Sequence, residues 1–372
     1  MYREHKGKQF RPALLFAVLA LFCFTGVASA QYLKDLPPPP PPPTPKPTPT
    51  PALKDEDFEV IRVSSNLVMV PVSVVNPGGQ AVHGLPVTDF RLEEEGRIQQ
   101  IVDIGNPDQV PLDIALLFDI SSSVSQKGFF AFQQRAAASF LRQVLKPMDH
   151  AAVFTIGAEP QMVAPLGSGE VAAAKLSAIP AATSSVSTSF YDTVAAAANY
   201  LNDKSPQNRR KVIVVISDGD DTSSKLLQQT MAEIRANQKV EPTRAAATEN
   251  LQLRHRRAVS EVQKAVQKSD AAFYSINPGG PSVHLNQIST RAQRGMESIA
   301  QSTGGTAFVP DGEKDLEKVF NEVAAELRGQ YLLQYYSNSQ LSGVGFRTIK
   351  VALPSNSDFR VRARLGYYPK PK

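Results

Sequence analysis

Continuous apolar runs in the middle of the chain predict strands that are buried on both faces. Residues 112–118 and 212–216 are almost wholly apolar, which is typical of central strands in a parallel sheet. Shorter runs predict further strands at 152–156, 162–166, 271–276 and 306–309. Helical spacing of apolar residues predicts helices at 129–145, 191–201, 291–301 and 315–327. Strands and helices that alternate in this way predict an α/β fold with a doubly wound, mostly parallel sheet at 111–330.

A period-two pattern predicts a small β module before this region. Valines occupy every second position from Val68 to Val74, as they do in a half-buried strand. Turn signals with the sequences Asn-Pro-Gly-Gly and Glu-Gly separate further apolar segments, so the module spans residues 58–106. Residues 331–372 return to β character. We expect these C-terminal strands to pack with the β module or to extend it.

Residues 224–269 interrupt the alternation of strands and helices. The segment is long for a single crossover and contains Arg-His-Arg-Arg at 254–257. We interpret it as a helical insertion with a solvated charged face. The formal net charge of the whole chain is +5, and residues 1–30 contribute +3 of it, with four basic residues against one acidic residue. The rest of the chain is too weakly basic to predict a nucleic-acid partner.

The first 57 residues resemble a targeting segment followed by a linker. A basic start, an apolar stretch at 13–27 and Ala28-Ser29-Ala30 predict a signal peptide at 1–30, cleaved after Ala30. An uncleaved N-terminal anchor is the alternative. Residues 31–57 are rich in proline, which fixes φ and lacks an N–H donor, so we expect a stiff linker. We therefore expect the mature protein to be secreted or to lie in the periplasm or cell envelope, with no integral membrane segment after signal cleavage.

Cysteine and histidine are poor candidates for a metal site in this chain. The only cysteine, Cys23, lies within the predicted signal peptide. The mature chain then has no thiol for disulfides, catalysis or thiolate coordination. The histidines outside the signal peptide are scattered and lack the spacing of metal ligands. A metal site in the mature protein would therefore depend on oxygen donors.

Oxygen-bearing side chains follow the two most apolar strands. Asp119, Ser121 and Ser123 form a D-x-S-x-S motif directly after residues 112–118, Asp218 follows 212–216, and Thr188 precedes the 191–201 helix. Ligands of open α/β sheets bind at the carboxyl ends of the strands. Two carboxylates and three hydroxyls, with no nitrogen or sulfur, form the kind of donor set that hard cations prefer. We expect a divalent cation here, Mg²⁺ first, with Mn²⁺ or Ca²⁺ as alternatives.

These motifs, in this order, resemble the metal-ion-dependent adhesion site (MIDAS) of von Willebrand factor A (vWA) domains. The matching motifs are D-x-S-x-S, then T-x-Φ-Y-D, then an apolar strand that ends in S-D-G. The flanking stretches LVMVPVSVVN and ELRGQYLLQYY resemble the bacterial VWFA-related domain family, in which a β module precedes the A domain and a β segment follows it.

The resemblance implies roles for the individual residues. Asp119, Ser121 and Ser123 would be primary metal ligands, and Thr188 and Asp218 would coordinate directly or through water. The chain departs from the family at residue 122, where serine replaces the usual glycine. Because residue 122 is not a ligand, this departure concerns the backbone of the loop and not the metal.

The resemblance also implies a binding protein rather than an enzyme. The cation would bridge to an acidic group on a partner protein or surface polymer, which makes the chain an exported adhesion or protein-binding module. A metal-stabilised structural envelope protein is the first alternative, and a metal-dependent hydrolase is the second. A hydrolase needs a base or nucleophile beside the cation, and no His, Lys or spare Glu accompanies the motif in a recognisable arrangement. We interpret Asp220 and Asp221, beside Asp218, as solvated acids.

Overall fold

The computed structural model describes residues 67–121, 130–239, 243–280, 287–337 and 345–369. The chain divides into two units, Met1–Arg62 and Val63–Lys372, and every described residue lies in the second. The predicted signal peptide and Pro-rich linker lie outside the described residues. None of the described helices combines the length and the apolar composition that a membrane span requires.

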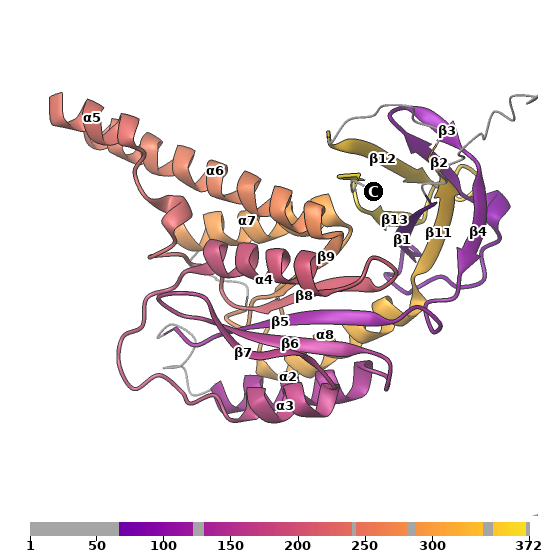
Figure 1. Ribbon diagram of the computed structural model, residues 1–372, viewed down its shortest axis with the longest axis horizontal. Coiled ribbons are helices and arrows are strands. Elements are labelled where there is room, and N and C mark those ends of the chain that lie inside the picture. Colours follow the sequence, from indigo (N-terminus) through magenta and orange to yellow (C-terminus); the bar gives the residue numbers. More distant parts are fainter. Residues whose placement is uncertain (1–66, 122–129, 240–242, 281–286, 338–344, 370–372) are drawn as a thin grey trace, which may run out of the picture. The chain divides into compact units, whose positions relative to one another are not determined.

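A mixed sheet of six strands forms the centre of the α/β part. The strands are β5 (Leu112–Asp119), β6 (His150–Ile156), β7 (Gln161–Gly167), β8 (Arg210–Ile216), β9 (Ala271–Ile276) and β10 (Ala307–Phe308). Their order in the sheet is β10-β9-β8-β5-β6-β7 (Figure 1). All pairs are parallel except β6 with the edge strand β7. Every residue of β5 and β8 is buried, which explains their apolar sequences. The predicted α/β fold with a doubly wound, mostly parallel sheet is confirmed.

Helices cover both faces of this sheet (Figure 1). One face packs against α2 (Phe130–Val144), α3 (Gly169–Ser177) and α8 (Glu313–Gly329). The other packs against α4 (Phe190–Lys204), α6 (Arg244–Ser269) and α7 (Gln287–Thr303). The sequence did not predict α3, because its buried face consists of two alanines and Leu176. The side chain of Ser168 caps this helix by accepting a hydrogen bond from the backbone N–H of Val171.

The segment 224–269, for which the sequence predicts a helical insertion, is mostly helical. It forms the short 3₁₀ helix η2 (Lys225–Leu227), α5 (Met231–Lys239) and the long helix α6. The C-terminal half of α6 buries Ala258, Val262 and Val266 against the central sheet. This half therefore serves as a covering helix of the α/β layer, and only the preceding part extends beyond it.

Two antiparallel sheets form the part of the structure outside the α/β part, and we call them together the β unit. Its strands are β1 (Leu67–Val75), β2 (Arg91–Glu94), β3 (Arg97–Gln99), β4 (Ile101–Gly105), β11 (Tyr331–Tyr336), β12 (Arg347–Ala352), β13 (Arg360–Ala363) and β14 (Gly366–Tyr367), with a 3₁₀ turn η1 (Val87–Asp89). The sheet orders are β13-β1-β11-β4 and β14-β12-β2-β3. Apolar side chains of both sheets share one core, including Val70, Leu92, Leu333 and Ile349. Segments that precede and follow the α/β part therefore build the β unit together.

Strand β1 contains a proline although strands flank it on both sides. Strand β11 pairs with residues 67–72 of β1, whereas β13 pairs only with residues 72–75. The ladder with β13 therefore begins after Pro71, and no ladder bond on that side requires a donor at this position.

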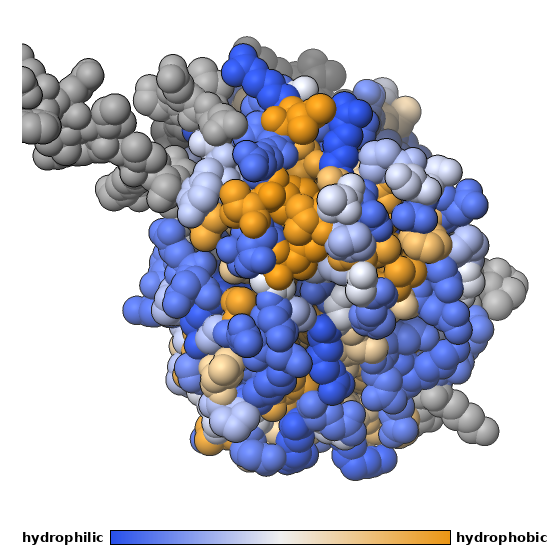
Figure 2. Space-filling view, turned by 90° about the vertical axis from the view of Figure 1, so that its right-hand side faces the viewer, coloured by the Kyte–Doolittle hydropathy of each residue, from blue (hydrophilic) through white to orange (hydrophobic). Residues whose placement is uncertain are grey.

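The β unit exposes several large apolar side chains. Leu67, Ile98, Val102 and Tyr336 are each between about two fifths and two thirds exposed. Figure 2 looks onto this side of the molecule and shows apolar residues gathered among polar ones. Apolar surface of this kind commonly marks a contact with another molecule.

A single carboxylate joins the β unit to the central sheet. Glu326 of α8 accepts hydrogen bonds from Ser73 Oγ of β1 at 2.9 Å, from Tyr274 Oη of β9 at 3.0 Å and from Arg362 Nη2 of β13 at 2.7 Å. Tyr274 is fully buried, so its hydroxyl depends on a protein partner. Glu326 therefore satisfies donors from three separate strands.

A second connection involves Arg364, which follows β13. Its guanidinium pairs with Asp270 at the C-terminal end of α6 and donates to the backbone oxygen of Met69 at 2.8 Å. The same group lies over the ring of Tyr367, 5.2 Å from the ring centroid. One arginine thereby connects α6 to two strands of the β unit.

We expect Glu326→Ala to lower the free energy of unfolding by about 3 kcal/mol, because a buried hydroxyl and a guanidinium both lose their acceptor. Urea denaturation monitored by circular dichroism measures this change. Glu322→Ala is the matched control, because Glu322 lies one turn earlier on α8 and its side chain is 50% exposed. We expect the control to change stability by less than about 0.5 kcal/mol. Equal losses in the two variants would contradict the connecting role of Glu326.

Candidate metal centre

The candidate metal centre lies where the strand order of the central sheet reverses. From β5 the chain continues to β6 and β7 on one side, and it then adds β8, β9 and β10 on the other. The carboxyl ends of strands at such a reversal form the usual ligand site of open α/β sheets. Asp119 is the last residue of β5, and Asp218 follows the end of β8 by two residues.

The carboxylate of Asp119 is fully buried at this edge, with 0% of the residue exposed. One oxygen accepts from Ser217 Oγ at 2.5 Å and the other from the backbone N–H of Ser121 at 2.7 Å. Burial above all, together with the negative charge of Asp218, raises the pKa of Asp119 to about 6, although the hydrogen bonds oppose the increase. An ionised carboxylate in this environment is unfavourable unless a positive charge compensates it.

The structure describes only part of the D-x-S-x-S motif. Ser121 is 2% exposed and follows β5 by two residues. Ser123 lies in the segment 122–129, outside the described residues. Its role as a ligand therefore stays a prediction.

Thr188 is held between the ends of two strands. Its backbone oxygen accepts from the N–H groups of Thr222 and Ser223, both at 2.9 Å, and its own N–H donates to Thr222 Oγ1 at 2.9 Å. The next residue, Ser189, donates from its N–H and its Oγ to the oxygen of Gly157, at 2.7 and 2.8 Å. Thr188 thus connects the loop after β8 to the end of β6, on either side of β5.

The loop after β8 requires glycine at position 219. Gly219 has φ +77°, and a Cβ atom there would lie 2.8 Å from Cε of Met296 on α7. The N–H of Gly219 donates to Ser217 Oγ at 2.9 Å, and Ser217 in turn donates to Asp119. This turn therefore joins Asp119 to the segment that carries Asp218. Asp218 is half-buried and accepts from the N–H of Asp220 at 3.2 Å.

Asp221 is not a solvated acid, and that interpretation of the sequence is wrong. One of its carboxylate oxygens accepts from the backbone N–H of Tyr191 at 2.8 Å and from Ser224 Oγ at 2.6 Å. Asp221 therefore satisfies an N–H group in the first turn of α4, from another part of the chain. Burial raises the pKa of its carboxyl group. No local pattern predicts this contact, because the two residues are 30 positions apart.

The second acid of this loop network is Asp192, in the first turn of α4. Its N–H donates to Ser224 Oγ at 3.0 Å, and its carboxylate accepts from the N–H groups of Lys225 and Leu226 at 2.7 and 3.3 Å. The loop after β8 and the start of α4 therefore hold each other in place, and Thr188 lies between them.

The donors at this edge fit a hard cation. Two carboxylates and two hydroxyl residues of the described chain lie at the end of β5, in the loops after β5 and β8 and in the segment before α4, and all of them offer oxygen. Among the described residues, no group of three or more His, Cys, Asp or Glu side chains is arranged to hold a metal.

We expect Asp221→Ala to lower the free energy of unfolding by about 1 to 2 kcal/mol, because the first turn of α4 loses an acceptor. Guanidinium denaturation measures the change. Asp203→Ala, at an exposed position near the other end of α4, is the control and should be nearly neutral. A neutral Asp221→Ala variant would show that the contact is not needed to hold the loop.

Comparisons with solved structures give several similar folds. A von Willebrand factor type A protein from Catenulispora acidiphila has 13% identity and a TM-score of 0.42, with 72% of this chain and 52% of that chain covered. The von Willebrand factor domain of a type V pilus tip protein from Porphyromonas gingivalis has 12% identity and a TM-score of 0.40, with 58% and 94% covered. Proximal thread matrix protein 1 from the mussel byssus, with a zinc-occupied MIDAS motif, has 14% identity and a TM-score of 0.44, with 64% and 50% covered.

The chain spans about half the length of the first of these structures. A comparison with curated proteins finds no significant match. The family model of the von Willebrand factor type A domain matches residues 113–322, which is more than half of the 372 residues. The matched segment begins within β5 and ends within α8, so it contains the central sheet and the candidate metal centre. The chain therefore belongs to the von Willebrand factor type A family.

Proposed function

We propose that this protein is an exported, non-enzymatic binding protein whose contact with its partner depends on a divalent cation. In this proposal Asp119, Ser121, Ser123, Thr188 and Asp218 hold the cation, which is Mg²⁺ first, with Mn²⁺ or Ca²⁺ as alternatives. The partner is a protein or surface polymer that bears an acidic group. The observation that carries the proposal is the buried carboxylate of Asp119, at the carboxyl end of the central strand.

A comparison within β5 supports the need for a cation at Asp119. Asp113, near the start of the same strand, is also buried, but Arg209 pairs with its carboxylate at 2.6 Å. Asp119 has only hydroxyl and N–H partners among the described contacts, and no cationic side chain lowers its pKa. A divalent cation would supply the missing positive charge.

The neutral hydroxyl donors bear on what the cation could bind. Two carboxylates neutralise a divalent ion formally, but serine and threonine hydroxyls add no charge, and the carboxylates are shared with protein donors. An ion held in this way keeps an attraction for an anionic group at a coordination position that water would otherwise fill. A carboxylate of a partner meets this requirement.

The surroundings of the two aspartates favour binding over catalysis. The described hydrogen bonds of Asp119 and Asp218 lead to serine and to backbone N–H groups, and none leads to a histidine or lysine that could act as a base.

The proposal that the protein is exported rests on the predicted signal peptide at 1–30. The alternative of a metal-stabilised structural protein shares the same site and differs only in the need for a partner.

The proposal predicts that Mg²⁺ or Mn²⁺ raises the melting temperature of the metal-free protein. A cation that binds only the folded state stabilises it by about 2.7 kcal/mol at a concentration 100-fold over Kd. We expect Asp119→Asn to abolish this shift and to melt above the metal-free wild type, because a neutral amide is less costly to bury. Asp203→Asn should keep the shift. Differential scanning calorimetry in chelator-treated buffer measures all three proteins, and an unshifted wild type at millimolar cation would contradict the metal site.

The proposal also predicts that partner capture needs the cation. Crosslinking capture from the envelope fraction of the producing cells should succeed in Mg²⁺ and fail in chelator. We expect Asp119→Asn and Asp218→Ala to lose capture with unchanged circular dichroism, whereas Lys264→Ala, at an exposed position of α6, keeps it. Capture that persists in chelator and in both aspartate variants would contradict a metal bridge. A melting shift without any cation-dependent capture would favour the structural alternative.

A further inference from the structure

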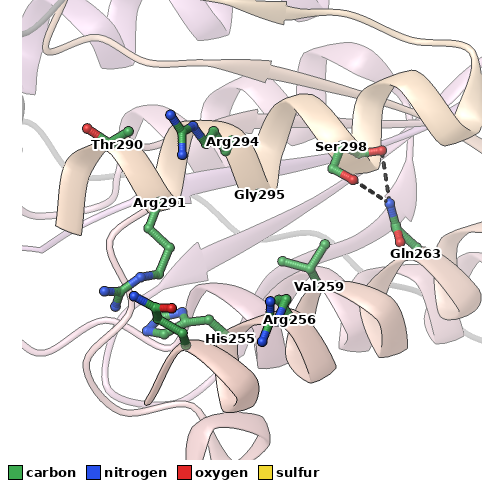
Figure 3. A pocket seen from close by; sticks show the side chains of 10 residues that line it. His255, Arg256, Val259, Gln263, Thr290, Arg291, Arg294, Gly295 and Ser298 are labelled. Carbon is green, nitrogen blue, oxygen red and sulfur yellow. Dashed lines mark hydrogen bonds between the residues drawn. The ribbon is translucent and has the colours of Figure 1, made fainter. Parts of the chain in front are cut away.

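A groove lies between α6 and α7, apart from the candidate metal centre (Figure 3). Its volume is about 680 Å³. Arg256 of α6 and Arg291 and Arg294 of α7 line it, and Arg291 reaches from its helix towards His255 on the other. The lining thus brings three guanidinium groups from two helices to one open surface.

Helical spacing places these side chains on facing sides. On α6, His255, Val259 and Gln263 follow one another at intervals of four residues. On α7, Arg294 and Ser298 are also four residues apart. A Cβ atom at Gly295 of α7 would lie 3.2 Å from Oη of Tyr191 on α4 and 3.4 Å from Cγ2 of Val259 on α6, so a small residue suits this position.

One end of the groove is closed by a polar contact between the helices. The Nε2 group of Gln263 donates to the backbone oxygen of Ser298 at 3.0 Å and to its Oγ at 2.8 Å (Figure 3). These bonds fix the separation of the two helices beside the arginines.

Among the described residues, the arginines of the groove have no carboxylate partner, whereas the neighbouring Arg254 and Arg257 are occupied by backbone oxygens. Arg257 and Arg254 donate to backbone oxygens of residues 226–228, so they secure the turn η2 to α6. Among the described residues, no carboxylate forms an ion pair with Arg256, Arg291 or Arg294, and none of the lining residues is acidic. Within the segment 254–257, Arg256 and Arg257 are exposed, whereas Arg254 and His255 are partly buried.

His255 lies beside the arginines of the groove. Burial above all, together with the positive charges of Arg291 and Arg254, lowers the pKa of this half-buried histidine to about 4. The imidazole is therefore neutral at neutral pH. Its ring packs edge-on against Tyr191, at 6.0 Å between centroids.

We propose that this groove binds an acidic polypeptide segment, through charge-assisted hydrogen bonds from Arg256, Arg291 and Arg294 to carboxylates. A guanidinium offers two parallel N–H donors that match a carboxylate. The groove is open along both helices, and Arg256 and Arg294 are exposed, whereas a small-molecule site would enclose its ligand. None of the described lining residues is Phe, Tyr or Trp, so the groove lacks the stacking rings typical of a single-stranded nucleic-acid site.

The test uses the full chain with the Asp119→Asn substitution, in metal-free buffer. This background removes the proposed metal centre, so the groove is tested independently of the proposed function. The probe is a fluorescent oligo-glutamate peptide, and fluorescence anisotropy measures its binding. We expect the added triple change Arg256→Gln, Arg291→Gln and Arg294→Gln to weaken binding about tenfold. We also expect the affinity of the unchanged groove to fall as salt concentration rises.

Two controls make the result specific to the groove. Arg235→Gln removes one positive charge, as the single Arg294→Gln variant does, but from an exposed position of α5, and it should leave binding unchanged. Arg294→Gln alone, at an exposed position, should give a partial loss without any risk to folding. Binding that is equal in the triple variant and its parent would overturn the proposal. So would equal binding of an oligo-glutamine peptide, or tighter binding of an oligothymidylate than of the acidic peptide.

Discussion

Burial of β5 on both faces is the constraint on which the rest of the structure depends. Every residue of this strand is buried, so its backbone groups pair with β6 and β8, and two helical layers must cover it. The strand also carries Asp119 into a region from which water is excluded. Its neighbours then determine which loops meet at its end, and these are the loops that hold Thr188 and Asp218. The unfavourable carboxylate and the oxygen-bearing side chains of the loops beside it are therefore consequences of one topology.

The β unit is built from the segments before and after the α/β part. A few charged side chains connect the β unit to the α/β part. Glu326 and Arg364 each contact more than one strand of the β unit and one element of the α/β part. Both make directional hydrogen bonds, and Arg364 also lies over the ring of Tyr367, so they orient the elements that they join. The strands that begin and end the described chain are thereby held against the same sheet and helices.

Local patterns in the sequence predict most of the helices and strands, but they do not predict contacts between segments that are far apart in the chain. The boundaries of β9 are those that the sequence predicts, and β5 and β8 were clear because double burial demands apolar residues at nearly every position. The α3 helix was missed, because alanine fills a buried face without a strong periodic signal. The contact of Asp221 with α4 and the facing arginines of α6 and α7 depend on how distant segments pack, which spacing along the chain does not encode. The role of Ser123 and the signal peptide stay predictions, since both lie outside the described residues.

The position of Pro71 in β1 has a consequence for the nascent chain. The partner strand β11 begins more than 250 residues after β1 ends, so during synthesis β1 waits roughly 10 to 50 s for it. Over that interval a valine-rich strand is open to pairing with a second nascent copy, as aggregation-prone segments do. A proline at its centre withholds one N–H donor from any such pairing and acts as a gatekeeper. The finished sheet needs no N–H donor from Pro71 on the side of β13, but this residue would protect the nascent chain from pairing with another copy before β11 is made.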